Sequence, residues 1–253
     1  MGDVLLEIRH GVAEIALNRP EKLNALSSSM RKLLGQCIET VAADPAVRLV
    51  LLRGEGRAFC SGADLDTIPE SPLAWRDRVL LAQRQHTALM RMGKVVVAAV
   101  QGAAFGGGAS LALAADILVL SENARLGFPF VKLGVIPDGG ATFLLQAKVG
   151  PAIAQDLLLS GGSLDANEAR SLGLTRRVVP EDQLLQTSRE LALSLSELPS
   201  EALMLTKAVC HQCWATNMEA AFAHEADAFG LVTATDGHKI AIERVRSKVP
   251  GQK

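Results

Sequence analysis

The stretch that most constrains the fold is residues 95–116, VVVAAVQGAAFGGGASLALAAD. Its first six residues, Val95 to Val100, form an unbroken apolar run that is typical of a buried strand. A glycine triplet follows at 106–108, and the alanine- and leucine-rich residues after it favour a helix. A turn between a strand and a helix presents backbone N–H groups that have no partner within the helix. The stretch therefore predicts an α/β protein with a turn that can face a negatively charged oxygen.

The triplet alone is a weak signal, because glycines at such a turn can also serve only to let a helix pack closely against a sheet. The stretch matches neither a GxGxxG dinucleotide motif nor a Walker loop, and no Lys-Ser/Thr pair follows it. Phosphoryl transfer is therefore disfavoured at this turn.

A second glycine-containing loop, RGEGRAFCSGADLD at 53–66, follows another apolar run at 47–52. Each of these two strand-to-loop transitions can contribute one backbone N–H donor. Two convergent donors are what an oxyanion hole requires. The sequence thus indicates a site that stabilises an oxyanion with main-chain groups.

The composition sets outer limits on the function. A chain of 253 residues is long enough for one large domain, or for a domain with an appendage. Its net charge of −1 gives no indication of nucleic acid or of an anionic membrane surface as a partner. The sequence contains no apolar run long enough to span a bilayer, and its first residues do not have the layout of a signal peptide. We therefore expect a cytoplasmic protein.

The cysteines do not predict a metal site. Cys210 and Cys213 form a CxxC pair, but zinc needs two more ligands and no second pair is near in the sequence. The pair also lies within a helical pattern. We interpret both as ordinary helix residues and expect no bound metal.

Strand and helix patterns alternate to about residue 195, and a helical region follows. Ser27 is a good N-cap for a helix with apolar residues at helical spacing, and a second, amphipathic helix is expected at 73–92. The C-terminal pattern predicts separate helices at 181–197, 200–216, 218–231 and 236–248. We accordingly expect a core at 1–195 and a helical oligomerisation region at 196–253.

Six segments in this order and spacing resemble the crotonase superfamily, the enoyl-CoA hydratases and isomerases. They are LNRPEKLNALS at 17–27, FCSGADLD at 59–66, AAVQGAAFGGGASLALAADI at 98–117, LGVIPDGGAT at 133–142, LLLSGGSLDANEARSLGLTRRVVP at 157–180 and ALMLTKA at 202–208.

The resemblance implies a spiral of ββα units with C-terminal helices that assemble trimers, often stacked as hexamers. It implies acyl-coenzyme A thioesters as substrates, with coenzyme A as part of the substrate and no prosthetic group. In the family, two backbone N–H groups hold the oxygen of a thioester enolate. Carried onto this sequence, these groups belong to Ala63 and Gly107, which agrees with the two glycine loops.

The departures from the family pattern bear on the reaction. Family hydratases use two glutamates, and this sequence has Ser110 and Phe130 at the matching positions. We interpret both as residues of the substrate pocket. Serine needs an activating partner to act as a base, and phenylalanine has no titratable group. Two-glutamate hydration is therefore disfavoured.

One carboxylate remains at a matching position, Asp138 in IPDGG. The resemblance to family isomerases with an aspartate base implies that it moves a proton during a double-bond shift. Apolar neighbours such as Phe130 are expected to raise its pKa. A structural alternative is that Asp138 is a helix N-cap, since Gly-Gly-Ala-Thr follows it.

Other reactions on the same scaffold stay open at this stage. They are hydration by an unusual water arrangement, and thioester hydrolysis or dehalogenation with Asp138 as nucleophile. A non-catalytic acyl-CoA-binding protein is a further alternative, because the two glutamates are missing. The resemblance also suggests residues for coenzyme A contacts. These are Lys22, Ala25, Ala63, Asp64 and Leu65.

Overall fold

The computed structural model describes residues 2–247, except for the side chains at positions 67, 212–217, 219–221, 224, 245 and 246. Within this part of the chain, the main sheet has six strands in the order β1-β2-β3-β4-β6-β9. The β1–β2 pair is antiparallel, and the other neighbours run parallel. The strands are β1 (Val4–Arg9), β2 (Val12–Leu17), β3 (Leu49–Gly54), β4 (Val95–Val100), β6 (Ile117–Ser121) and β9 (Arg177–Val179).

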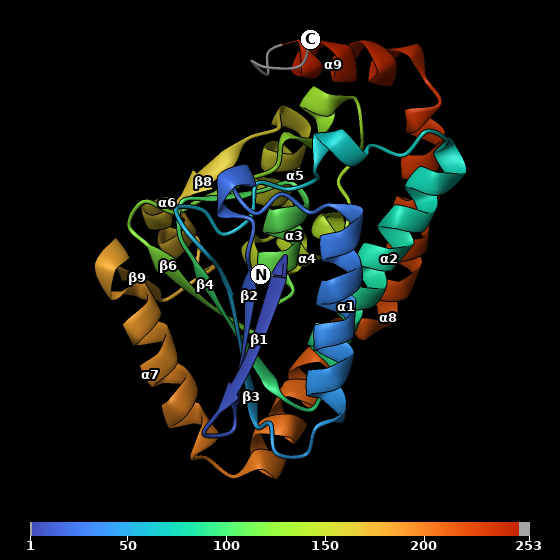
Figure 1. The fold of residues 1–253 in the computed structure, drawn as a ribbon. Helices are drawn as coiled ribbons and strands as arrows, with labels where there is room; N and C mark the ends of the chain where they lie inside the picture. The colour runs from blue at the N-terminus through green and yellow to red at the C-terminus, as the bar shows by residue number, and fades with distance from the viewer. Residues whose placement is uncertain (1, 248–253) are drawn as a thin grey trace.

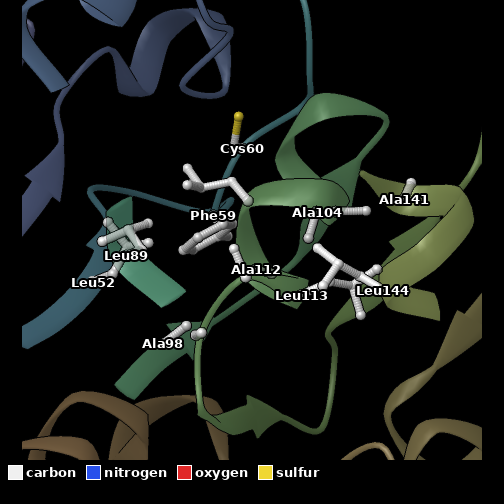
Figure 2. Close-up of a cluster of buried hydrophobic side chains, with 14 of the residues drawn as sticks. Leu52, Phe59, Cys60, Leu89, Ala98, Ala104, Ala112, Leu113, Ala141 and Leu144 are labelled. Carbon is white, nitrogen blue, oxygen red and sulfur yellow. The ribbon is translucent and has the colours of Figure 1, made fainter. Parts of the chain in front are cut away.

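Helices cover both faces of this sheet (Figure 1). On one face, α7 packs over β3 and β4, in a cluster that includes Val97 and Ala99. The intervening residue Ala98 belongs to the larger core on the opposite face, which also contains Phe59 and Leu52 (Figure 2). β4 is buried along its whole length, as the apolar run predicted.

The predicted helix N-terminus at Ser27 is confirmed. The Ser27 hydroxyl accepts a hydrogen bond from Met30 N (3.1 Å), and α1 begins at the next residue. The predicted helix at 73–92 is α2. The helices and 3-10 turns outside the C-terminal region are η1 (Pro20–Lys22), α1 (Ser28–Ala43), η2 (Leu65–Thr67), α2 (Pro72–Arg91), α3 (Gly107–Leu113), η3 (Pro129–Leu133), α4 (Ala141–Val149), α5 (Pro151–Ser160), α6 (Ala166–Ser171), η4 (Glu181–Gln183) and α7 (Leu184–Ser196).

A short strand separates β4 from the glycine triplet, which the sequence pattern did not predict. This strand, β5 (Ala103–Phe105), joins β7 (Arg125–Gly127) and β8 (Ser163–Asp165) in a small second sheet. Cys60 donates through its N–H to Ala103 O (3.0 Å) and accepts from Phe105 N (2.9 Å). The two glycine-containing loops are therefore joined by main-chain hydrogen bonds.

The prediction of two helices divided near Asn217 is wrong. A single helix, α8 (Ser200–Thr233), runs through this position, and α9 (Asp236–Arg246) follows it. α8 packs along α2 (Figure 1). Such packing outweighs the mild helix penalty of an asparagine, which is about 0.7 kcal/mol at most. The division at residue 195 and the role of the later residues in oligomerisation stay predictions.

Among the described residues, no helix is both long enough and apolar enough to span a bilayer.

Candidate active site

The first backbone donor lies in the loop that contains Ala63. This residue forms an isolated parallel bridge with Leu26, in which Leu26 N donates to Gly62 O (2.7 Å) and Asp64 N donates to Leu26 O (3.3 Å). Both bonds use the neighbours of Ala63, so the N–H of Ala63 itself points away from Leu26. It donates to no group in the described part of the chain.

The second donor is Gly107 N–H, at the first residue of α3. It has no acceptor among the residues the structure describes, as is usual in the first turn of a helix. A Cβ placed on Gly62 would lie 3.7 Å from Gly107 N. The N–H groups of Ala63 and Gly107 therefore belong to loops in direct contact.

Glycine is required at 108, the residue after the second donor. A Cβ there would overlap the carbonyl oxygen of Cys60. Gly107 itself is different, because a Cβ on it would make only ordinary contacts, such as 3.7 Å to Arg31 Nη2 and 3.8 Å to Asp138 Oδ1. The two glycines thus differ: Gly108 allows the loops to touch, whereas Gly107 has room for a methyl group beside it.

Asp138 lies on the same side of Gly107 as Arg31. It is 8% exposed, and its buried Oδ1 has no hydrogen-bond partner in the described structure. The alternative that Asp138 caps a helix is wrong: Gly140 is the N-cap of α4, and no side chain of the cap residue bonds the helix. The sequence suggested a cap because Asp often precedes a first turn, but two residues with positive φ, Gly139 and Gly140, separate Asp138 from α4.

Glu225, on α8, binds the N-terminus of α4 instead. One of its carboxylate oxygens accepts from Gly140 N (2.6 Å) and Gln83 Nε2 (3.0 Å), and the other accepts from Thr142 Oγ1 (2.8 Å). Burial raises the pKa of Glu225 to about 7, although these hydrogen bonds oppose the shift. The residues that follow Asp138 are thereby fixed from a helix more than eighty positions away.

Two arginines place positive charge near Asp138. Arg31, on α1, and Arg78, on α2, both have a pKa lowered by burial, to about 10 for Arg78. Burial raises the pKa of Asp138, and the charges of Arg31 and Arg78 oppose that shift without cancelling it. The Arg78 guanidinium also lies 5.3 Å from the ring centroid of Trp75. The site therefore combines a carboxyl group of raised pKa with a positive field.

His86 bonds the same loop. Its Nδ1 lies 2.7 Å from the carbonyl oxygen of Gly139. Burial lowers the pKa of His86 to about 4, so the ring is neutral near pH 7 and Nδ1 carries the proton that it donates. This bond holds the peptide that follows Asp138.

Ser110 joins the two predicted parts of the site. It is fully buried, and its hydroxyl lies 2.8 Å from Asp138 O and 3.2 Å from Gly106 O, so it donates to these carbonyls. Phe130 is also buried, and its Cε1 lies 3.8 Å from the position of a Cβ on Gly106. That both residues line a substrate pocket stays a prediction.

The residues predicted to contact coenzyme A lie around the first loop. Asp64 accepts from Arg19 Nη1 (2.7 Å), which also donates to Ala25 O (2.7 Å). Lys22 is exposed and forms an ion pair with Asp66 (3.2 Å). Leu65 is half-buried in η2. These residues lie together, and their binding of coenzyme A stays a prediction.

Sequence reasoning missed Arg31, Arg78 and Glu225 as site residues, and did not place His86 beside Asp138. Arg31 carried a signal, since it stands three and seven residues before the buried Leu34 and Ile38 and so shares their helix face. A charge on an apolar face is a candidate functional group. The position of Glu225 depends on how α8 packs, so the sequence offered no comparable signal.

Comparison with known proteins decides the family. Residues 7–248 match the family described as enoyl-CoA hydratase/isomerase. The chain belongs to the enoyl-CoA hydratase/isomerase family. A crotonyl-CoA hydratase of Syntrophomonas wolfei is 34% identical over 239 residues, which cover 94% of this chain and 92% of that protein. A 1,2-epoxyphenylacetyl-CoA isomerase of Escherichia coli is 37% identical over 211 residues, covering 81% and 80%.

Solved structures of enoyl-CoA hydratase/isomerase proteins confirm the crotonase-like α/β fold. An enoyl-CoA hydratase of Mycobacterium avium subsp. paratuberculosis superposes with a TM-score of 0.89 at 30% identity, covering 96% of this chain and 98% of that one. Pseudomonas aeruginosa OdaA superposes with a TM-score of 0.90 at 29% identity, covering 97% and 99%. The relatives include both hydratases and an isomerase, so the family alone does not assign the reaction.

No group of three or more His, Cys, Asp or Glu side chains that could hold a metal occurs among the described residues. Cys210 is a free, exposed thiol in α8, and the side chain of Cys213 lies outside the described residues.

Proposed function

We propose that this chain is an enoyl-CoA double-bond isomerase in which Asp138 moves a proton between C2 and C4 of the acyl group. The observation that carries the proposal is the position of the Asp138 carboxyl group. Its unpartnered Oδ1 lies 3.8 Å from the position of a Cβ on Gly107, the residue that provides one of the proposed oxyanion donors. A base and an oxyanion donor are therefore adjacent.

The thioester oxygen accepts hydrogen bonds from the N–H groups of Ala63 and Gly107. These donors are held by the surrounding backbone, so they need little reorganisation when negative charge develops on the oxygen. Losing one such donor typically costs about 3–4 kcal/mol of transition-state stabilisation. The two loops thus favour the enolate over the neutral thioester.

Asp138 then acts as the single base. Its carboxylate takes a proton from C2 of a 3-enoyl-CoA, and the electron pair of the C2–H bond delocalises over the diene and the thioester oxygen. The carboxylic acid returns the proton to C4, and the double bond comes to lie between C2 and C3. A raised pKa makes Asp138 a stronger base than an ordinary aspartate, which suits this exchange near neutral pH.

The surroundings of Asp138 give little support to a second catalytic carboxylate. Glu225 lies nearby, but both of its oxygens accept hydrogen bonds from Gly140, Gln83 and Thr142. The hydroxyl of Ser110 donates to main-chain carbonyls. A double-bond shift needs one base, whereas the two-glutamate hydration reaction needs two.

Hydration is the second candidate, because hydratases are the more numerous among the named relatives. Both reactions are tested by giving the purified protein 3-hexenoyl-CoA and, separately, 2-hexenoyl-CoA. We expect the first to be converted to the 2-enoyl thioester, with slow or absent water addition to the second. Rapid hydration of 2-hexenoyl-CoA, release of free coenzyme A, or tight binding without turnover would each overturn the isomerase proposal.

For the coenzyme, we propose that Lys22 meets a phosphate and that the main chain around Ala25, Ala63, Asp64 and Leu65 borders the pantetheine and nucleotide. The exposed position of Lys22 beside these residues supports this assignment. Assembly of the chain into a trimer or hexamer is part of the same proposal and is tested by light scattering.

A further inference from the structure

We propose that Arg31 makes the site selective for acyl-CoA substrates whose short acyl group carries a carboxylate at its far end. The inference rests on the proposed function for the reaction and adds the class of acyl group.

Two nitrogens of the Arg31 guanidinium are buried without a hydrogen-bond partner in the described structure. The residue is 4% exposed, and neither Nε nor Nη2 has a partner in the described structure. These two nitrogens form one edge of the planar group and present parallel N–H donors. Two parallel donors match the two oxygens of a carboxylate. A buried charge without partners is costly, so the free edge indicates a place for an acceptor that the chain itself does not supply.

Asp138 does not fill this role. Arg31 Nη2 and Asp138 Oδ1 lie 3.7 and 3.8 Å from the same point, the position of a Cβ on Gly107, so at most about 7.5 Å separates them. They nevertheless form no ion pair, and Oδ1 accepts no hydrogen bond. The guanidinium and the carboxyl group thus lie on the same side of Gly107, and in this proposal a ligand that enters between them meets both.

The charges around this space favour an anion. Arg31 contributes a buried positive charge beside Asp138. The other carboxylates nearby are engaged: Asp64 pairs with Arg19, and Glu225 accepts three hydrogen bonds. A substrate carboxylate therefore provides the acceptor that Nε and Nη2 of Arg31 lack, whereas a neutral acyl tail provides none.

The position of Arg31 limits the length of the acyl group. Nη2 lies beside Gly107, the residue whose N–H holds the thioester oxygen in the proposed function. A carboxylate that reaches Arg31 is consequently separated from the thioester by only a few carbons. A six-carbon acyl group, with the reacting double bond between its two carboxyl ends, is a suitable probe.

The test compares 3-hexenedioyl-CoA with 3-hexenoyl-CoA, which have the same chain length and differ in the terminal carboxylate. We expect wild type to favour the diacid by about 10- to 100-fold in kcat/KM, the range expected for loss of a charge-assisted hydrogen bond. Arg31→Met should abolish this preference. Arg176→Met, at an exposed arginine outside the site, should keep it. Equal kcat/KM for the two substrates in wild type, or an unchanged preference in Arg31→Met, would overturn the proposal.

Binding separates this inference from the proposed reaction. Isothermal titration with the unreactive thioesters adipoyl-CoA and hexanoyl-CoA needs no turnover. Tighter binding of adipoyl-CoA by wild type than by Arg31→Met supports the role of Arg31 even if the isomerase assay fails. If Arg31→Met does not fold, Arg31→Gln takes its place. The affinities of wild type for adipoyl-CoA and hexanoyl-CoA are also compared directly. Equal affinity of wild type for the two ligands would contradict the role of Arg31.

Discussion

The candidate site has two halves, one formed by main-chain N–H groups and the other by side chains. The oxyanion half consists of main chain. Cys60, Gly62 and Asp64 form hydrogen bonds with neighbouring segments, and the N–H groups of Ala63 and Gly107 donate to no group among the described residues. The carboxylate half consists of side chains from distant elements, since Asp138 lies among Arg31 of α1, His86 of α2 and residues of α8. The oxyanion half is held by main-chain hydrogen bonds that also form the fold. The carboxylate half contains buried titratable groups with shifted pKa values.

The difference shows where the reaction is decided. A pair of N–H donors stabilises any thioester enolate, so the oxyanion half suits every reaction of the family. The identity of the base, its pKa and its charged neighbours belong to the carboxylate half. Groups buried with strongly perturbed pKa values are typical of functional sites. Substitutions in the carboxylate half should therefore change which reaction is catalysed. Substitutions in the oxyanion half should lower the rate of every reaction that passes through a thioester enolate.

The largest effect is expected from Asp138→Asn. Asparagine keeps the shape of the side chain but cannot accept a proton, so kcat for 3-hexenoyl-CoA should fall by about 10³-fold, within the range of general acid–base catalysis. Steady-state kinetics measures this loss. Binding of hexanoyl-CoA should change little and serves as the control for folding. A variant that keeps a tenth or more of the wild-type kcat would rule out Asp138 as the base.

A pair of glycine variants tests the oxyanion half. In Gly108→Ala the added methyl group overlaps Cys60 O, so the loops must separate and kcat should fall by about 10²- to 10³-fold, the value of one oxyanion donor. Gly107→Ala makes only ordinary contacts and should fold with nearly the wild-type melting temperature, because its φ is not positive.

The methyl group added in Gly107→Ala nevertheless lies beside both Arg31 and Asp138. Because it takes room that the proposed substrate needs, this variant should chiefly raise KM. Calorimetry gives the melting temperature of each variant, and steady-state kinetics gives its kcat and KM. Equal melting temperatures for the two variants would contradict the claim that glycine is required at 108 for the two loops to touch.

Glu225→Gln tests how the carboxylate half is held. The pKa of Glu225 is raised from 4.5 to about 7, so the folded state binds this proton more tightly than the unfolded state does. Stability from this group is fully present below pH 4.5 and is lost as the pH rises through 7, by about 3 kcal/mol in all. Glutamine does not titrate, so the variant should lack this loss.

Denaturant unfolding of wild type and Glu225→Gln at pH 5 and pH 8 isolates the effect, because other titrating groups act equally in both proteins. Parallel pH dependences would contradict the raised pKa. A decrease in kcat of a few-fold is expected as well, since Gly140 and Thr142 are then held less firmly.

The smallest effect is expected from Lys22→Met. The Lys22–Asp66 ion pair is exposed, and such pairs contribute at most about 1 kcal/mol. The melting temperature should therefore change little, while KM for acyl-CoA should rise a few-fold if the ammonium meets a phosphate. The rise should shrink at high salt, because exposed charges are screened. An unchanged KM at low salt would remove Lys22 from the coenzyme site.

The two halves also differ in how far the sequence predicts them. Local pattern is enough to place the buried strand β4, the cap at Ser27 and the glycine loops, because each depends on neighbouring residues. It does not place Arg31, His86 and Glu225 around one loop, since that depends on how α1, α2 and α8 pack. The same limit explains the error at Asn217, where a local helix break was predicted, and the failure of the alternative that Asp138 caps a helix. Packing against α2 accompanies a continuous α8 through Asn217, and Glu225 binds the N-terminus of α4 where the alternative placed Asp138.

The central claim is that one carboxylate carries a proton from C2 to C4. It is tested most directly with 3-hexenoyl-CoA deuterated at C2, by measuring the deuterium content of the product at C4 by NMR in wild type and Asp138→Asn. We predict measurable transfer of the label to C4 by wild type and none above background by Asp138→Asn. Equal transfer by both proteins, or a hydrated product without the label at C4, would contradict the account.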